Sequence, residues 1–307
     1  TLFQKMSIFT IILSAESIIG IVGNVFIALV NCMDWIKRRK ISLVDQILTS
    51  LAISRLGLLC SALTHTMLYT VHPDWLKTEK MLRMFIIAWV VTNHFSIWLA
   101  TCLILFYFLK IANFSNSIFL YLKWKVKKVV LVALLISLVL LLFNIIAIDI
   151  QINVWMDRSK RNVSYTYSLK NFKQLPRLLL FYSSMFMLIP FIMSLIACVL
   201  LIFSLWKHWK KMRHNAKGSR DAGTAAHIKA MQTVITFLLL YTMYLFCLIM
   251  QISSFEFLEE ENILFFEHAI GIAFPSGHSL ALIPGNSKLR QAFLSVPWCL
   301  WCRAKGL

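Results

Sequence analysis

The sequence predicts an all-α membrane protein, a bundle of seven transmembrane helices, and three observations lead to this prediction. The 307-residue chain is 59% hydrophobic and only 14% charged, whereas about a quarter of the residues in a soluble domain are charged. Seven apolar stretches are each long enough to cross a hydrocarbon core of about 30 Å, which takes roughly 20 helical residues. Basic loops separate these stretches. The composition excludes a soluble domain, and one bundle accounts for the whole length, so we assign 1–307 to a single domain.

Each predicted span is an apolar run that stops where charged residues begin. Three loops and the C-terminal tail hold most of the Lys and Arg residues, and one of these loops, 110–128, carries five lysines and no acidic residue. The predicted spans, in chain order, are 8–32, 46–67, 82–109, 126–150, 178–205, 228–252 and 263–283. We expect loops of about ten to thirty residues between them, and boundaries good to about three residues.

The basic residues are distributed unevenly between the two sides of this bundle. The formal net charge is +18, and 20 of the 31 Lys and Arg residues fall in the loops 33–44, 110–128 and 206–229 and in the C-terminal tail. An excess of Lys and Arg marks the cytosolic side. The sequence therefore predicts an extracellular N-terminus and a cytosolic C-terminus. This placement favours contact with anionic membrane lipids or docking of a cytosolic partner, and it argues against nucleic acid.

Two N-x-Ser sequons provide an independent check of this orientation. They begin at Asn113 and Asn162, and a single predicted span separates them, so only one can face the lumen. The charge rule selects Asn162 as the glycan acceptor. None of the seven cysteines lies in a predicted outer loop, so we expect no extracellular disulfide.

Charged and amide side chains inside the spans require a reason, because a charge in the hydrocarbon costs about 2.5–3.5 kcal/mol on insertion scales. Arg55 lies ten residues after Asp45, about 15 Å into the second span. Asn24 lies ten residues before Asp34 and so reaches the same depth. A guanidinium beside an amide carbonyl makes a satisfied pair. Such a pair can hold helices together, act as a switch centre, or do both.

The outer half of the bundle contains a second group of polar and aromatic side chains. Trp89 precedes Lys110 by 21 residues, or about 32 Å, and His268 lies 16 residues before Pro284. Apolar pockets with a few orienting polar groups are typical of small-molecule sites. The bland alternatives are an interfacial anchor for Trp89 and a hydrogen-bonded core histidine for His268. The six side chains predicted to share an outer cleft are Trp89, Asn93, His94, Phe186, Tyr241 and His268.

Several runs together resemble the bitter taste receptors (taste receptor type 2), a family of seven-helix G-protein-coupled receptors. They are FIALVNCMDWIKRRKIS at 26–42, DQILTSLAISR at 45–55, NHFSIWLATCLILFYFLKIANFSNSIFLYLKWKVKKVVL at 93–131, LLIFSLWKHWKKM at 200–212 and PSGHSLALIPGNSKLRQAFLSV at 275–296. The resemblance covers the whole chain. The signatures of rhodopsin-like receptors are replaced by Phe-Tyr-Phe-Leu-Lys at 106–110 and by His-Ser at 278–279 with Gly-Asn at 285–286, as in this family.

The resemblance also implies roles for particular residues. The six outer side chains match positions that line the family's pocket for bitter compounds. Asn24, Ser54 and Arg55 match an intramembrane polar centre, and Tyr107, Lys110, His278 and Ser279 match the inner activation region. Two departures stand out. His268 replaces the Glu or Gln common in relatives, and Pro284 precedes Gly285-Asn286 where an aliphatic or aromatic residue is usual.

The function implied by this resemblance is that of a multi-pass receptor in the plasma membrane. Its expected partners are small, mostly apolar bitter agonists, membrane lipids, and a heterotrimeric G protein with gustducin or another inhibitory-class α subunit and βγ. Such a protein is not an enzyme and needs no cofactor or metal.

Two other classes of membrane protein, lipid phosphatases and transporters or channels, fit this sequence less well than a receptor. Pro275-Ser276-Gly277-His278 coincides with the central motif of membrane lipid phosphatases, but no Arg-Pro dipeptide occurs and no histidine follows His278, so the second catalytic histidine is missing. A transporter or channel would be expected to show internal repeats and interrupted helices. No repeat is evident, and only Pro190 and Pro275 interrupt deep spans.

Overall fold

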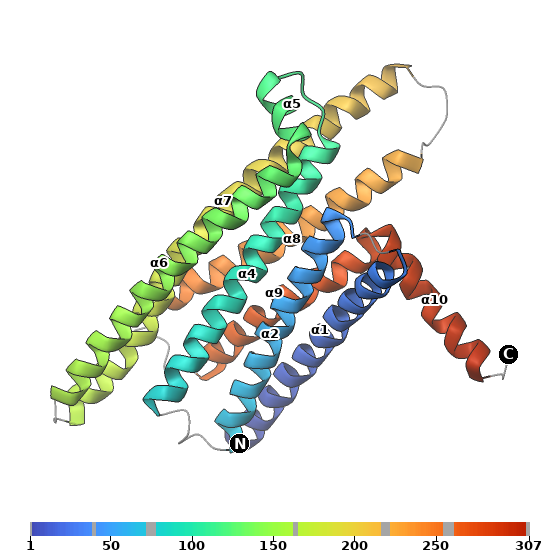
Figure 1. The fold of residues 1–307 in the computed structure, drawn as a ribbon. Coiled ribbons are helices and arrows are strands. Elements are labelled where there is room, and N and C mark those ends of the chain that lie inside the picture. Colours follow the sequence, from blue (N-terminus) through green and yellow to red (C-terminus); the bar gives the residue numbers. More distant parts are fainter. Residues whose placement is uncertain are drawn as a thin grey trace.

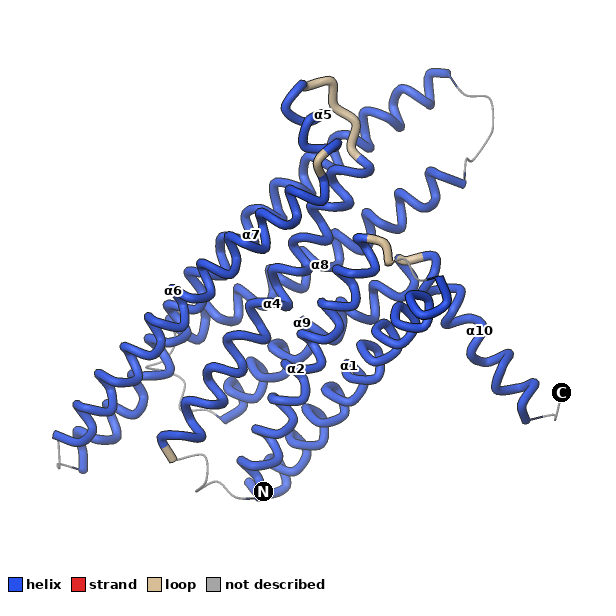
Figure 2. The backbone as a smooth tube through the Cα atoms, viewed as in Figure 1, coloured by secondary structure: helices blue, strands red, loops and turns tan. Residues whose placement is uncertain are grey.

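The computed structural model describes the backbone of residues 2–38, 41–71, 78–161, 165–215, 222–253 and 261–304. All of the regular structure in these residues is helical, and no strand occurs among them. Figure 2 shows helix along almost the whole described chain, with short loops beside α5. The helices are α1 (Leu2–Arg38), α2 (Leu43–Val71), α4 (Glu79–Ile111), α5 (Ser117–Trp124), α6 (Val126–Arg161), α7 (Tyr165–Asn215), α8 (Ala222–Ser253), α9 (Glu261–Gly285) and α10 (Ser287–Ala304).

The long helices form one bundle with a closed ring of neighbours. Contacts run from α1 to α2, α4, α7, α8 and α9 and back to α1, and α6 packs outside against α4 and α7. The N-terminus lies at one end of the bundle, while α5, the end of α4 and the start of α6 lie at the other (Figure 1). Helix α10 leaves the bundle after α9 and points away from it (Figure 1). Helix α4 is more enclosed than α1, α2, α6, α7 and α8. In its most apolar segment 61% of the residues are buried, against 28–44% in the corresponding segments of those five helices.

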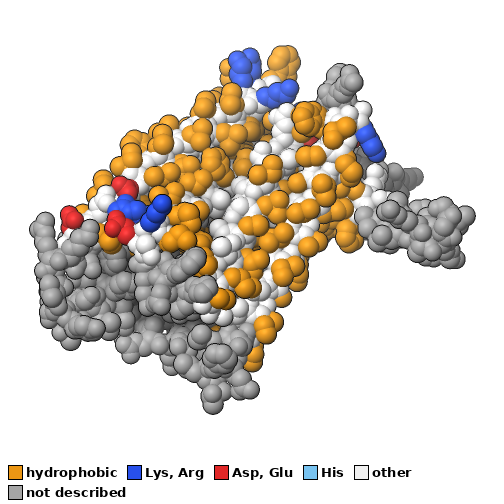
Figure 3. Space-filling model, turned by 60° about the horizontal axis from the view of Figure 1, so that its bottom comes forward, with side chains coloured by type: hydrophobic (Ala, Val, Ile, Leu, Met, Phe, Trp, Pro, Cys, Tyr) orange, Lys and Arg blue, Asp and Glu red, His pale blue; other side chains and the backbone are white. Residues whose placement is uncertain are grey.

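The apolar surface of the bundle matches a lipid environment. Six helices in the described part of the chain, α1, α2, α4, α6, α7 and α8, are long and apolar enough to cross a membrane. Large apolar side chains remain exposed along them, for example Leu135 and Phe143 of α6, at 53% and 59%. Orange apolar side chains cover the flank of the molecule, while charged side chains lie near its ends (Figure 3). Exposed apolar area on this scale marks contact with lipid or another apolar partner.

The seventh predicted span, 263–283, coincides with α9, which packs along α1 and α8. Pro275 and Pro284 both lie inside this helix, so Pro284 does not end it. The break comes two residues later, where the Asn286 side-chain carbonyl accepts hydrogen bonds from the backbone N–H groups of Lys288 (3.0 Å) and Leu289 (3.2 Å). This is an N-cap, and it starts α10 in a new direction.

Two predicted loops, 151–177 and 206–229, are wrong as loops. Helix α6 continues to Arg161, α7 spans 165–215, and α8 begins at Ala222. A hydropathy criterion finds the part of a helix inside the hydrocarbon. Lys, Arg, Gln and Met are good helix formers, so the helices continue beyond the apolar segment.

Ion pairs fasten the helices at the two ends of the bundle. Near the N-terminal end, Arg83 of α4 pairs with Glu79 on its own helix (3.0 Å) and with Asp149 of α6. At the other end, Lys288 of α10 lies 2.9 Å from Asp34 of α1 and 3.2 Å from Asp45 of α2. The Arg83–Asp149 pair thus joins α4 to α6.

The cysteines whose side chains are described are all free thiols: Cys32, Cys60, Cys102, Cys198 and Cys247. The side chains of Cys299 and Cys302 lie outside the described residues, and so does Asn162, the predicted glycan acceptor.

Candidate functional site

The polar centre of the bundle is built around Arg55, which is completely buried on α2. Its Nε donates to Ser96 Oγ of α4 at 3.3 Å, its Nη1 donates to Ser279 Oγ of α9 at 2.8 Å, and its Nη2 contacts His278 Nδ1. All three partners are neutral groups, and no carboxylate pairs with Arg55 among the described residues. One guanidinium therefore joins three helices.

This geometry determines the protonation pattern of His278. A guanidinium has only N–H donors, so Nδ1 of His278 must accept the hydrogen bond and its proton sits on Nε2. The imidazole is 2% exposed, and the Phe237 ring of α8 covers it with centroids 4.8 Å apart. The neutral ring is thus an acceptor for Arg55 on one side and an aromatic contact for α8 on the other.

Asn24 belongs to this centre, but it does not pair directly with Arg55 as predicted. Its Oδ1 accepts from Ser279 Oγ at 2.8 Å, and its Nδ2 donates to Gly20 O at 2.8 Å. Ser279 stands between them, because it accepts from Arg55 and donates toward Asn24. The predicted pair assumed that equal depth means contact, whereas the distance between helices also has to be bridged.

His278 and Ser279 were predicted in the inner activation region, but they contact Arg55 in the polar centre. The prediction of the centre also missed Ser96 and included Ser54, which does not contact Arg55. Ser96 was missed, although it lies 14 residues before Lys110, or about 21 Å, so depth counting on the third span could have found it. Ser54 was included, but its hydroxyl donates to Leu51 O of the same helix at 3.0 Å. Hydroxyls inside membrane helices commonly bond to their own backbone.

In the half of the bundle that contains the N-terminus (the N-terminal half of the bundle), Asn93 and Tyr241 are buried between α4, α7 and α8. Asn93 Nδ2 donates to Tyr244 Oη at 3.2 Å and lies 3.9 Å from the sulfur of Met187. Tyr241 Oη donates to the Met187 carbonyl at 2.6 Å. Tyr244, which sequence reasoning missed, stacks on Phe274 of α9 with centroids 5.3 Å apart and planes at 7°. These contacts join four helices of the ring.

His94 and Asn93 do not face the same space, although they are adjacent in sequence. His94 Nε2 contacts the Ser137 carbonyl of α6 at 2.9 Å, and its ring lies 5.9 Å from Trp98. Consecutive helix positions are about 100° apart, so Asn93 points to α7 and α8 while His94 points to α6. The shared cleft predicted for the two residues is not formed by their side chains as the structure has them.

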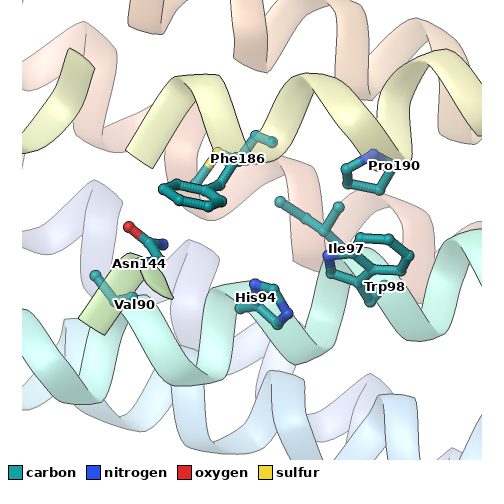
Figure 4. Close-up of a pocket in the computed structure, with 8 residues that line it drawn as sticks. Val90, His94, Ile97, Trp98, Asn144, Phe186 and Pro190 are labelled. Atoms are coloured by element: carbon teal, nitrogen blue, oxygen red, sulfur yellow. The ribbon is translucent and has the colours of Figure 1, made fainter. Parts of the chain in front are cut away.

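A small cavity lies beside His94 between α4, α6 and α7 (Figure 4). Its volume is about 10 Å³, which is room for about one water molecule. Trp98 Nε1 and Asn144 Oδ1, both at this cavity, are buried without a hydrogen-bond partner. The lining residues are Val90, His94, Ile97, Trp98, Asn144, Phe186, Met187 and Pro190.

The remaining predicted residues are distributed as follows. Trp89 is half-buried and packs against two apolar clusters, one central and one between α4 and α6. Tyr107 is also half-buried near the inner end of α4, and Lys110 is exposed there. The side chain of His268 lies outside the described residues.

The arrangement offers no sign of a metal or phosphate-transfer site. No group of three or more His, Cys, Asp or Glu that could hold a metal occurs in the part of the chain that the structure describes. Ser276, Gly277 and His278, the core of the phosphatase-like motif, lie inside α9. Backbone N–H groups in a helix interior are engaged by helical hydrogen bonds, so they cannot cradle a phosphate.

Comparison with known proteins decides the family. The family model described as "Taste receptor protein (TAS2R)" matches residues 2–301. This chain belongs to the taste receptor type 2 family. It is 55% identical to taste receptor type 2 member 14 of Macaca mulatta over 299 residues, which cover 97% of this chain and 94% of the relative.

Rodent members of the taste receptor type 2 family are comparably similar. Identity is 55% over 296 residues to member 140 of Rattus norvegicus, covering 96% of this chain and 94% of the relative. It is 52% over 294 residues to member 103 of Mus musculus, covering 96% and 92%. Family membership and the apolar helices together support a bitter-taste receptor of the G-protein-coupled class that crosses the membrane several times.

Proposed function

We propose that this chain is a plasma-membrane receptor that binds small, mostly apolar bitter compounds and activates a heterotrimeric G protein with gustducin or another inhibitory-class α subunit. In this proposal residues 1–307 form one domain with seven spans, α9 being the seventh, an extracellular N-terminus and a cytosolic C-terminus. The observation that carries the proposal is a continuous set of contacts from buried polar groups in the N-terminal half of the bundle to the Arg55 centre.

The agonist pocket in this proposal lies in the N-terminal half of the bundle. Asn93 supplies an amide and Tyr241 a hydroxyl in a mostly apolar interior, which suits an apolar ligand with a few polar groups. The cavity beside His94 has room for only about one water, so agonist binding requires side chains there to move. The residues proposed to contact agonist are Trp89, Asn93, His94, Phe186, Tyr241 and His268.

Transmission in this proposal follows the aromatic contacts through the ring. Tyr244 receives the Asn93 hydrogen bond and stacks on Phe274, which lies 5.7 Å from Phe237. Phe237 covers His278, the Arg55 acceptor. A ligand shifts a receptor only by its differential affinity for the two states. An agonist that displaces Asn93 or Tyr244 would therefore bias the packing around His278 and Ser279.

The G protein in this proposal docks at the end of the bundle that carries α5, near Tyr107 and Lys110. The segments 110–128 and 206–229 are rich in Lys and Arg. Complementary charge steers association and sets orientation more than it adds affinity. We expect the acidic or neutral surface of a G-protein α subunit to meet this basic face.

We predict that screening bitter compounds in cells co-expressing a promiscuous G protein will identify an agonist that releases calcium, and that Trp89→Ala will raise its half-maximal concentration at least tenfold. Removing the indole deletes apolar contact area beside the proposed pocket. Trp35→Ala, at a 53% exposed position on α1, is the matched control and should respond normally. Equal responses of the two variants at equal surface expression would make Trp89 an interfacial anchor instead. Absence of any agonist-dependent nucleotide exchange would count against the receptor proposal itself.

The orientation yields a separate prediction about glycosylation. Asn162→Gln should abolish the shift in electrophoretic mobility that glycosidase treatment produces, because only the luminal sequon is modified. Asn113→Gln is the matched control and should leave the shift intact. Asn113 lies in the loop between α4 and α5, before α6 in the chain, whereas Asn162 follows α6. If α6 crosses the membrane once, the two sequons face opposite sides. The opposite pattern would place the N-terminus in the cytosol.

A further inference from the structure

A second pocket lies at the α5 end of the bundle, and none of its lining residues is among those proposed to contact agonist. Its volume is about 470 Å³, within the range of about 300–1,000 Å³ typical of small-molecule sites. The first residues of α2 and α6, the end of α4 and the loop around α5 contribute to it. Its lining residues are Ser42, Leu43, Val44, Phe106, Lys110, Lys123, Trp124, Lys125, Val126, Lys127 and Lys128.

The charge of this pocket has one sign. Five of its lining residues are lysines and none is acidic. Asp45 follows the lining residues Leu43 and Val44 and accepts from Ser42 Oγ at 2.7 Å, but its charge is already paired with Lys288 at 3.2 Å. Lys123 Nζ donates to the Ala112 carbonyl at 2.9 Å and lies 5.8 Å from the Phe119 ring centroid, and Lys125 Nζ lies 5.9 Å from the Tyr121 ring centroid. The positive charge is thus positioned and has no acid in the pocket to neutralise it.

The amino end of α6 adds to this positive potential, whereas the amino end of α2 is capped by Ser42 and carries Asp45 in its first turn. Leu43 and Val44 are the first residues of α2, and Val126, Lys127 and Lys128 are the first residues of α6. The first N–H groups of a helix lack intrahelical acceptors and carry partial positive charge. Lysines in a first helical turn are unfavourable by themselves, because they repel the positive end of the helix dipole. An anion that binds there stabilises both the amino end of α6 and the lysines in its first turn.

The pocket also lies at an apolar surface. Helix α5 exposes Ile118, Tyr121 and Trp124 at 70%, 64% and 91%, and their spacing of three places them on one side of the helix. Exposed Trp and Tyr beside lysines are typical of the membrane–water interface. Trp124 itself lines the pocket, so the cavity opens at the depth of lipid headgroups.

We propose that this pocket binds the headgroup of a polyphosphorylated inositol lipid. A headgroup with several phosphates provides acceptors for several lysines and for the amino end of α6 together, whereas a lipid with a single negative charge cannot engage them all. The tethered acyl chains lie along the exposed side of α5. The bound lipid would join the starts of α2 and α6 to the end of α4, the region where a G protein is proposed to dock. The leaflet involved depends on the proposed orientation, but the binding itself depends on neither agonist nor G protein.

The test measures binding of dioctanoyl phosphatidylinositol 4,5-bisphosphate to the full-length receptor in neutral detergent, without agonist. We expect this lipid to bind at least tenfold more tightly than dioctanoyl phosphatidylserine and than free inositol trisphosphate. The triple variant K125Q/K127Q/K128Q should weaken its binding at least tenfold. The control triple variant K37Q/K207Q/K210Q removes the same charge from exposed positions outside the pocket and should change affinity less than twofold.

Several outcomes would overturn the proposal. Equal loss in both triple variants would show a diffuse charge effect, and equal affinity for inositol trisphosphate would show a soluble-phosphate site. Unchanged lipid binding with impaired G-protein activation in the pocket variant would assign these lysines to the G protein. Because binding is read without agonist, these results are distinct from failure of the receptor proposal.

Discussion

Arg55→Ala is expected to leave almost no folded receptor at the cell surface. The substitution removes a completely buried side chain and strips Ser96, Ser279 and His278 of their donor. Each hydrogen bond to a charged group contributes about 1.5–3 kcal/mol, while removing a buried charge relieves a desolvation cost. Leaving the buried acceptors without a donor costs about 1–3 kcal/mol each, and together this is a large part of a typical folding free energy of about 5–15 kcal/mol.

Two further variants separate the sources of this effect. Arg55→Lys keeps the charge but not the planar fork that reaches three helices, so its thermal stability should lie between those of wild type and Arg55→Ala. Arg55→Met fills much of the volume without a charge. Arg290→Ala, at a half-buried position on α10, is the control and should behave as wild type. If Arg55→Met matched wild type in melting temperature and agonist response, the network would be neither a fastener nor a switch.

Gly20→Ala is expected to destabilise the receptor by about 2 kcal/mol, in the range of about 1–3 kcal/mol seen for overpacking. A Cβ at Gly20 would overlap Ser276 Oγ of α9 and lie 2.8 Å from Leu59 Cδ1 of α2. Both neighbours are buried. Helix α1 would have to move away from α9, which separates Asn24 from Ser279 one turn further on. Gly20→Leu should prevent surface expression altogether.

Gly271→Ala is the matched control for this prediction. A Cβ at Gly271 would meet no atom within 4 Å, and Gly271 lies within α9. Replacing a helical glycine by alanine there should leave stability unchanged or raise it by up to about 1 kcal/mol. The readout is the fraction of detergent-purified receptor that remains monodisperse after heating. Equal melting of the two variants would show that α1 has room to yield at Gly20.

Sequence reasoning placed elements along the membrane normal more reliably than loops or contacts. Hydropathy located six membrane-capable helices and α9, because burial in hydrocarbon requires about 20 apolar residues whatever the neighbours are. Depth counting put Arg55 and Asn24 in the same network. Hydropathy did not locate the ends of α6, α7 and α8. Polar residues that favour helix continue these helices beyond the apolar segment, where hydropathy no longer distinguishes helix from loop.

The direction in which each side chain points could not be predicted in the same way. In a soluble helix the apolar stripe shows which face is buried. Here the spans are apolar on most sides, because lipid and protein interior are equally apolar. Asn93 and His94 illustrate the consequence, since their depth was predictable but their partners, Tyr244 on α8 and Ser137 on α6, were not. The same holds for Ser279 between Asn24 and Arg55.

The sequence alone determined the fold class, the family to which the chain is similar, the approximate position of the spans and the basic loops. The tertiary structure decided the rotation of each helix about its axis, and with it the partners of Arg55, the separation of His94 from Asn93, and the gathering of lysines from α4, α6 and the loop around α5. The physical reason is that depth in a bilayer is a property of one segment, whereas rotation is set by the packing of several segments against one another.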